Sequence, residues 1–89
     1  MNFIDFSNVE LKEYDGVFIL KNNNTTLGFV RYNNLSEVEY IFVNPLFRKR
    51  KLAIKLLKLV KEKTQKKLIF QKPLSPLGLK LLKSIEEWN

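Results

Sequence analysis

Short runs of β-branched and aromatic residues, closed by asparagine-rich turns, dominate the first half of the chain. The first run covers residues 17–20 and ends at the polar stretch 21–24. A second run covers 27–32 and stops at an Asn-Asn pair, and a third covers 37–43. Residues 1–15 alternate loosely and predict either a first strand or an irregular lead-in. Strands joined by short polar loops indicate an antiparallel meander.

The 37–43 run predicts a strand with two distinct faces. Because side chains alternate along a strand, one face is expected to carry Glu37, Glu39, Ile41 and Val43, and the other Val38, Tyr40 and Phe42. Two acidic side chains would then lie on the same face as the residue that ends the strand, just before Pro45.

The second half of the chain follows a helical period. From about residue 47 to 64, apolar residues recur at helical spacing, and a charged stripe lies opposite them (Lys51, Lys55, Lys58 and Glu62). Residues 67–71 read as a short strand, and the strand–helix–strand order predicts a parallel pair. Ser75-Pro76 is a helix start signal, with the last helix running to about residue 88. The expected fold is one α+β domain over residues 1–89, a β-meander followed by α-β-α.

Composition removes several classes of chemistry. The chain has neither cysteine nor histidine, so disulfides, thiol nucleophiles, cysteine-ligated metals and the commonest general base are excluded. No apolar run approaches the roughly 18 residues of a membrane span. The first residues lack the basic region and apolar core of a signal peptide. A soluble cytoplasmic protein is expected.

The net charge of +7 is unevenly distributed. Residues 48–67 contain ten Lys or Arg and a single acid, while the rest of the chain is slightly acidic. A basic surface of this kind is typical of a solvated helix face, of a site for a polyphosphate cofactor, or of a surface that binds nucleic acid or an acidic protein.

Residues 43–57 combine a strand end, a turn and the start of a basic helix. The start of such a helix can bind an anion, because backbone N–H groups are free at a helix N-terminus. The segment 38–60, VEYIFVNPLFRKRKLAIKLLKLV, resembles the strand, V-x-P turn, loop and helix of the GCN5-related N-acetyltransferases (the GNAT superfamily). That family carries a Q/R-x-x-G-x-G/A signature in the loop. Arg48 matches its first position and Ala53 its last, while Lys51 stands where the family has glycine and Lys49 where many members have another.

The resemblance implies that this loop holds the pyrophosphate of acetyl-CoA and that the strand end pairs with its pantetheine arm. The cofactor-binding residues expected on this basis are Phe42, Val43, Arg48, Lys49, Arg50, Lys51, Leu52, Ala53 and Ser75. A lysine in place of glycine either obstructs the close approach of a phosphate or compensates by pairing with it.

Downstream, the segment 67–85 resembles the fifth strand and following helix of the family. Ser75, Gly78 and Leu82 stand where many members have Asn, a small residue and Tyr. Leu82 cannot protonate a leaving thiolate, and Ser75 is also a plain N-cap. The resemblance covers residues 17–85, and the last two strands of the family are absent.

Acetyl transfer to an amine requires a base and donors for the developing oxyanion. The candidate bases are Glu37 and Glu39, and the alternative is that they are exposed strand residues paired with Arg31 or lysines. By resemblance, the Val43 N–H is the donor to the thioester carbonyl. Tyr32 and Tyr40 are either core residues or part of the acceptor side.

Three functions remain open at this stage. The first is an acetyl-CoA-dependent N-acetyltransferase that modifies an amine, with a protein lysine as the expected acceptor. The second is a GNAT-fold binding module without catalysis that binds CoA, an acidic protein or nucleic acid. The third is a nucleic-acid-binding domain that shares the element order. A monomer or a homodimer is expected, since the sheet leaves an edge strand open.

Overall fold

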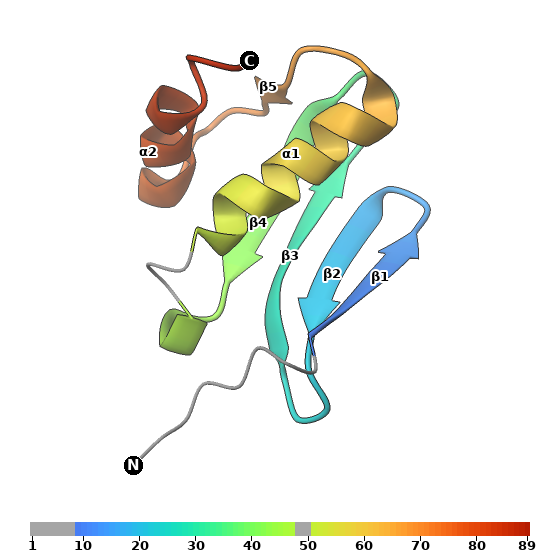
Figure 1. Ribbon diagram of the computed structural model, residues 1–89. Helices are drawn as coiled ribbons and strands as arrows, with labels where there is room; N and C mark the ends of the chain where they lie inside the picture. Colours follow the sequence, from blue (N-terminus) through green and yellow to red (C-terminus); the bar gives the residue numbers. More distant parts are fainter. Residues whose placement is uncertain (1–8, 48–50) are drawn as a thin grey trace.

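The computed structural model describes residues 9–47 and 51–89, and it contains one five-stranded sheet with helices on one side (Figure 1). The strands are β1 (Glu10–Tyr14), β2 (Val17–Lys21), β3 (Thr26–Tyr32), β4 (Glu37–Val43) and β5 (Ile69–Phe70). The helices are a 3₁₀ turn, Pro45–Phe47, then α1 (Leu52–Thr64) and α2 (Pro76–Ser84).

The strands lie in chain order, antiparallel from β1 to β4 and parallel between β4 and β5. This confirms the predicted α+β class, the meander and the parallel pair. Three boundaries differ from the prediction: α1 begins at Leu52 rather than near residue 47, β5 has only two residues, and α2 ends at Ser84 rather than near residue 88. β1, one of the two expectations for residues 1–15, is a regular strand although all five of its residues are exposed.

Turn residues fix the path of the meander. Gly16 joins β1 to β2 with a φ of 79°, a left-handed conformation that suits glycine. In the next turn, the Asn22 carboxamide oxygen accepts from the backbone N–H groups of Asn24 and Thr25. Before β4, the Asn33 carboxamide oxygen accepts in the same way from two N–H groups. The asparagine-rich stretches are thus Asx turns, as their sequence indicates.

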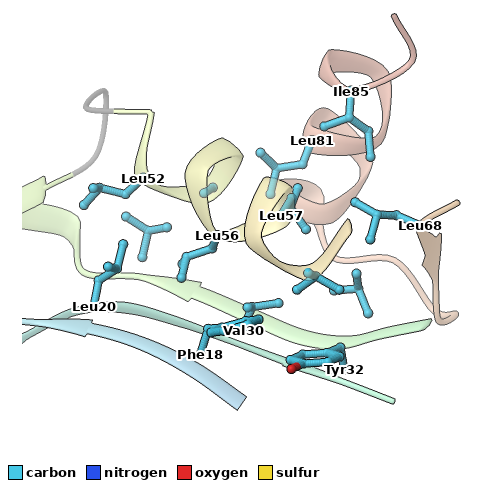
Figure 2. Packing of buried hydrophobic residues seen from close by; sticks show 14 of the residues in the cluster. Phe18, Leu20, Val30, Tyr32, Leu52, Leu56, Leu57, Leu68, Leu81 and Ile85 are labelled. Atoms are coloured by element: carbon cyan, nitrogen blue, oxygen red, sulfur yellow. The ribbon is translucent and has the colours of Figure 1, made fainter. Parts of the chain in front are cut away.

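Both helices pack on the same face of the sheet. Figure 2 shows Phe18, Leu20 and Val30 on the side of the sheet that faces α1. Leu81 of α2 and Ile85, the residue just after that helix, lie on the same side. Leu56, Leu57 and Val60 of α1 are fully buried against them. Gly28 lets the backbone of β4 approach closely, because a Cβ there would lie only 2.7 Å from the Phe42 carbonyl oxygen.

The opposite face of the sheet carries a row of aromatic side chains. Phe29 stacks on Tyr40 with ring centroids 5.7 Å apart and lies 5.6 Å from Phe42. Within the described part of the chain no helix covers this row, and Tyr40 is 56% exposed. None of the described helices is long and apolar enough to cross a membrane.

A β-bulge in β4 corrects the predicted arrangement of its side chains. Arg31 pairs with Tyr40, but the next residue of β3, Tyr32, pairs with Val38, so Glu39 is an extra residue in β4. The alternation therefore breaks at Glu39. Val38 is 4% exposed and lies in the core with Val43, on the opposite face from Tyr40. The prediction that Val38, Tyr40 and Phe42 share a face was wrong, because the period of two assumed an unbroken strand.

Candidate functional site

The edge of β4 is open over most of its length. β5 pairs with β4 only at Glu37–Ile69 and Val38–Phe70, and the Gln71 N–H then donates to the Val38 carbonyl at 3.1 Å. Beyond that bond the chain turns away through Pro73 into α2, as Figure 1 shows, while β4 continues to Val43. The two strands separate where the family resemblance places the pantetheine arm.

The backbone groups along this open edge are oriented to pair with an extended ligand. The Asn44 N–H donates to the Leu27 carbonyl at 2.7 Å. Because hydrogen-bonded and non-hydrogen-bonded pairs alternate in an antiparallel ladder, Phe42 also directs its backbone groups toward β3. Ile41 and Val43 therefore direct their N–H and C=O groups away from β3, into the gap between β4 and α2.

A groove of about 800 Å³ lies between the start of α1 and α2. We call it the α1–α2 groove. It brings together five of the residues predicted to bind the cofactor: Val43, Lys51, Leu52, Ala53 and Ser75. Its other walls are largely apolar, and a second lysine, Lys80, joins Lys51 on its lining. Such a groove suits a ligand with an apolar arm and an anionic end.

A smaller hollow of about 220 Å³ continues along the open edge of β4. We call it the edge hollow. Glu39, Tyr40 and Ile41 line it on the β4 side, and Ser75 lines both the edge hollow and the α1–α2 groove. The two spaces therefore share Ser75 as a wall, and between them they are lined by β4 residues from Val38 to Val43.

The N-terminus of α1 is arranged to bind an anion. Lys51 precedes the helix with φ 58° and ψ 25°, its side chain does not cap the first turn, and that turn contains no acid. The N–H groups of the first turn have no intrahelical partners, and they carry the positive end of the helix dipole. Lys51 stands where the family resemblance places a glycine. Although it has a side chain, Lys51 adopts the left-handed conformation that glycine adopts easily.

Ser75 acts as a helix cap. Its Oγ accepts a hydrogen bond from the Gly78 N–H at 3.0 Å, and Pro76 occupies the first turn of α2. This confirms the N-cap reading. Its position on the lining of both spaces leaves open its second predicted role, contact with a pantetheine amide.

The two candidate bases are in different environments. The Glu37 carboxylate accepts from the Asn33 side-chain N–H at 2.8 Å, and Glu37 lines neither the groove nor the edge hollow. Glu39 is exposed at the bulge and lines the edge hollow. Only Glu39 therefore lies beside the space that would hold a reacting group.

Spacing along β4 also separates Glu39 from Val43. Four residues of strand span about 13 Å, so the Glu39 side chain and the Val43 N–H do not reach the same atom. Ile41 is only two residues from Glu39, about 7 Å along the strand, and its N–H points into the gap. Ile41 was missed at the sequence level, because which N–H groups face the gap follows from the pairing of β4 with β3.

Other predicted residues lie outside this site. Phe42 packs against Phe29 on the aromatic face, and its backbone faces β3. Arg48, Lys49 and Arg50 lie outside the described residues. Tyr32 is 7% exposed in the core and Tyr40 lines the edge hollow. Lys80 was not predicted, although its helical spacing from Pro76 and Leu77 places it on the same face of α2.

Comparison with known proteins supports what the geometry indicates. The chain matches the family model described as Acetyltransferase (GNAT) family over residues 2–72, a range that includes every strand and α1 but not α2. The searches of curated proteins and of solved structures gave no match. The matched range covers most of the chain, and the mixed sheet with an open β4 edge has the expected arrangement. The chain belongs to the acetyltransferase (GNAT) family.

Proposed function

We propose that this protein transfers an acetyl group from acetyl-CoA to an amine, with the side chain of a lysine in a polypeptide as the acceptor. The observation that carries this proposal is the open edge of β4 beside the α1–α2 groove. In this proposal the pyrophosphate lies at the N-terminus of α1, near Lys51 and the N–H groups of Leu52 and Ala53. The pantetheine arm pairs with Val43 and extends past Ser75.

The edge hollow is the proposed site of transfer. Glu39, directly or through water, accepts a proton from the acceptor ammonium. The free amine then forms a bond to the thioester carbonyl carbon and the C–S bond breaks. CoA leaves as a thiolate and takes up the proton that the new amide nitrogen releases. The Ile41 N–H is the proposed donor to the carbonyl oxygen as negative charge develops on it. The hollow is small and open to solvent, which favours a side chain on a large acceptor.

Binding of the donor is tested by thermal unfolding with acetyl-CoA, CoA and ATP. A ligand at about a hundred times its Kd raises the stability of the native state by about 2.7 kcal/mol, which moves the midpoint of so small a domain by several degrees. We expect a rise with both CoA compounds and a smaller one with ATP, which has the phosphates but no pantetheine arm. Equal rises with all three would contradict a site that recognises the arm.

Transfer is tested by release of the CoA thiol in the presence of lysine-containing peptides. The chain has no cysteine, so a thiol reagent detects CoA without background from the protein. Glu39→Gln is expected to lower the rate by about 10²-fold or more while the acetyl-CoA-induced rise in midpoint persists. Glu37→Gln is the matched control and is expected to leave the rate within about twofold of wild type.

The binding-module alternative predicts a different pair of results. If acetyl-CoA raises the midpoint but no peptide or amine accepts the acetyl group, the protein binds the cofactor without transferring it. Leu82, at the position where many members have the tyrosine acid, is the feature that favours this alternative.

A further inference from the structure

A second hollow lies at the other end of α1 from the groove. Its volume is about 490 Å³, and it is enclosed by the β1–β2 turn, the end of β3, the loop before β4 and the last turn of α1. We call it the Tyr32 pocket. Since α1 has 13 residues and rises 1.5 Å per residue, the pocket lies about 20 Å from the Lys51 end of that helix. It is therefore separate from the proposed cofactor site.

The Tyr32 hydroxyl is the unusual group in this pocket. The side chain is 7% exposed and its ring stacks on Phe18 with centroids 5.3 Å apart. Among the described residues the hydroxyl has no hydrogen-bond partner. Every side-chain nitrogen or oxygen of these residues that is fully inaccessible to solvent does have a partner. The hydroxyl oxygen must therefore be the accessible part of this buried side chain, and the space it opens into is the Tyr32 pocket.

The charges around this hydroxyl are mainly negative. Glu13 and Asp15 line the pocket, and the C-terminal end of α1 adds the negative end of its dipole. Glu13, Asp15 and Lys63 line the same pocket as Tyr32. Burial raises the pKa of Tyr32, the charges of Glu13 and Asp15 raise it further, and the charge of Lys63 lowers it. Lys63 Nζ lies 3.4 Å from Glu13 Oε2, whereas the Asp15 carboxylate makes no ion pair within the described residues.

We propose that the Tyr32 pocket binds an organic ammonium ion, with the Tyr32 hydroxyl oxygen accepting a hydrogen bond from it and the Asp15 carboxylate pairing with its charge. Lys63 competes with the bound ammonium ion, because the Lys63 ammonium already pairs with the Glu13 carboxylate. The pocket is far larger than a bare metal ion needs, and the described residues contain no cluster of three or more acidic metal ligands. This inference is independent of acetyl transfer and of CoA binding.

The probe is 1,4-diaminobutane, compared with 1,4-butanediol and succinate, and binding is measured by NMR titration of the full chain without CoA. We expect the diamine to shift the amide signals of Gly16 and Thr64, and the diol and dicarboxylate to leave them unchanged. Tyr32→Phe keeps the ring stacked on Phe18. Because the hydroxyl has no hydrogen-bond partner in residues 9–47 and 51–89, this substitution is expected to leave the thermal midpoint at neutral pH unchanged. It should weaken diamine binding about tenfold.

Three further variants separate this site from general attraction to acids. Asp15→Asn keeps a residue that suits the turn before Gly16 and should weaken binding about tenfold. Glu10→Gln removes the same charge from an exposed position of β1 outside the pocket, and it should change the affinity by less than twofold. Lys63→Gln releases Glu13 and should strengthen binding several-fold.

Each contrary result overturns the proposal. Absence of binding at millimolar diamine excludes an ammonium site. Equal weakening by Glu10→Gln and Asp15→Asn shows general attraction to acids, and weaker binding in Lys63→Gln shows that the pocket prefers anions. None of these results depends on whether the protein transfers acetyl groups.

Discussion

Substitution of Lys51 tests the conformation on which the proposed anion site depends. Lys51 has φ 58° and ψ 25°, the left-handed region. A side chain with a Cβ costs about 1–2 kcal/mol there relative to glycine. Glycine loses more conformational entropy on folding, which offsets about 0.5–1 kcal/mol. We therefore expect Lys51→Gly to be more stable than Lys51→Ala by about 1 kcal/mol, a difference of about 4–8 °C in midpoint for a domain of this size.

The assay is thermal and urea unfolding of both variants, monitored by circular dichroism. The urea midpoint is expected to change while the slope does not, since the surface exposed on unfolding is the same. Lys51→Asn should lie between the two, because asparagine tolerates the left-handed region better than alanine. The matched control is the pair Lys55→Ala and Lys55→Gly at an exposed position within α1. There the alanine variant should be more stable than the glycine variant by about 1 kcal/mol.

The sign of the difference in stability between Lys51→Gly and Lys51→Ala tests whether residue 51 is left-handed. If Lys51→Ala is as stable as Lys51→Gly or more stable, the residue before α1 is not left-handed, and the first-turn N–H groups are not presented as proposed. If the sign is as expected, Lys51→Gly should keep its acetyl-CoA-induced rise in midpoint, because backbone N–H groups hold the anion in our proposal.

Three further outcomes follow from packing, capping and ionisation. Gly28→Ala places a Cβ 2.7 Å from the Phe42 carbonyl oxygen and should cost about 1–3 kcal/mol of unfolding free energy in urea melts; an unchanged midpoint would contradict the close approach of the strands. Ser75→Ala removes the cap of α2 and should cost about 1 kcal/mol, whereas Ser75→Asp should retain most of it. Because the pKa of Tyr32 is raised, the folded state holds this proton more strongly than the unfolded state, so stability should fall as the pH rises above about 10. Tyr32→Phe should show a smaller fall over the same range, and equal falls would refute the assignment.

The sequence was sufficient for most of the fold. The asparagine turns, the helical period after residue 47 and the Ser75-Pro76 signal predicted the meander, both helices and the parallel pair, because each depends on local preferences. The start of α1 was placed too early, since Pro45–Phe47 forms a separate 3₁₀ turn. The exposed β1 strand was only one of two expectations, because its residues lack the apolar alternation that indicates a half-buried strand.

The site was less predictable than the fold. The bulge at Glu39 depends on how β4 pairs with β3, and no period within β4 reveals an extra residue. The backbone groups that face the gap, those of Ile41 and Val43, likewise follow from the pairing of β4 with β3, and the proposed carbonyl donor is Ile41 rather than Val43 because Ile41 lies closer to Glu39 along the strand. Lys80 enters the α1–α2 groove because α2 packs beside α1, a tertiary contact that local patterns do not encode.

The short pairing between β4 and β5 has a consequence for motion. Each antiparallel pair from β1 to β4 joins five residue pairs, whereas β4 and β5 join two. Leu68, the residue just before β5, is tied to the C-terminal residue. Its N–H donates to the Asn89 carboxamide oxygen at 2.7 Å, and its carbonyl oxygen accepts from the Asn89 side-chain N–H at 3.0 Å. Segments with few cooperative contacts open by local unfolding well below the global free energy.

We therefore expect β5 and α2 to open together, before the meander, and to carry one wall of the α1–α2 groove with them. Native-state hydrogen exchange would show this as faster exchange at Ile69 and Gln71 than at Val30. A ligand bound in the groove would slow exchange at those two amides by holding the wall closed. If the cofactor binds in the α1–α2 groove as proposed, its affinity would then fall under conditions that favour this opening, because one wall of the groove would be displaced.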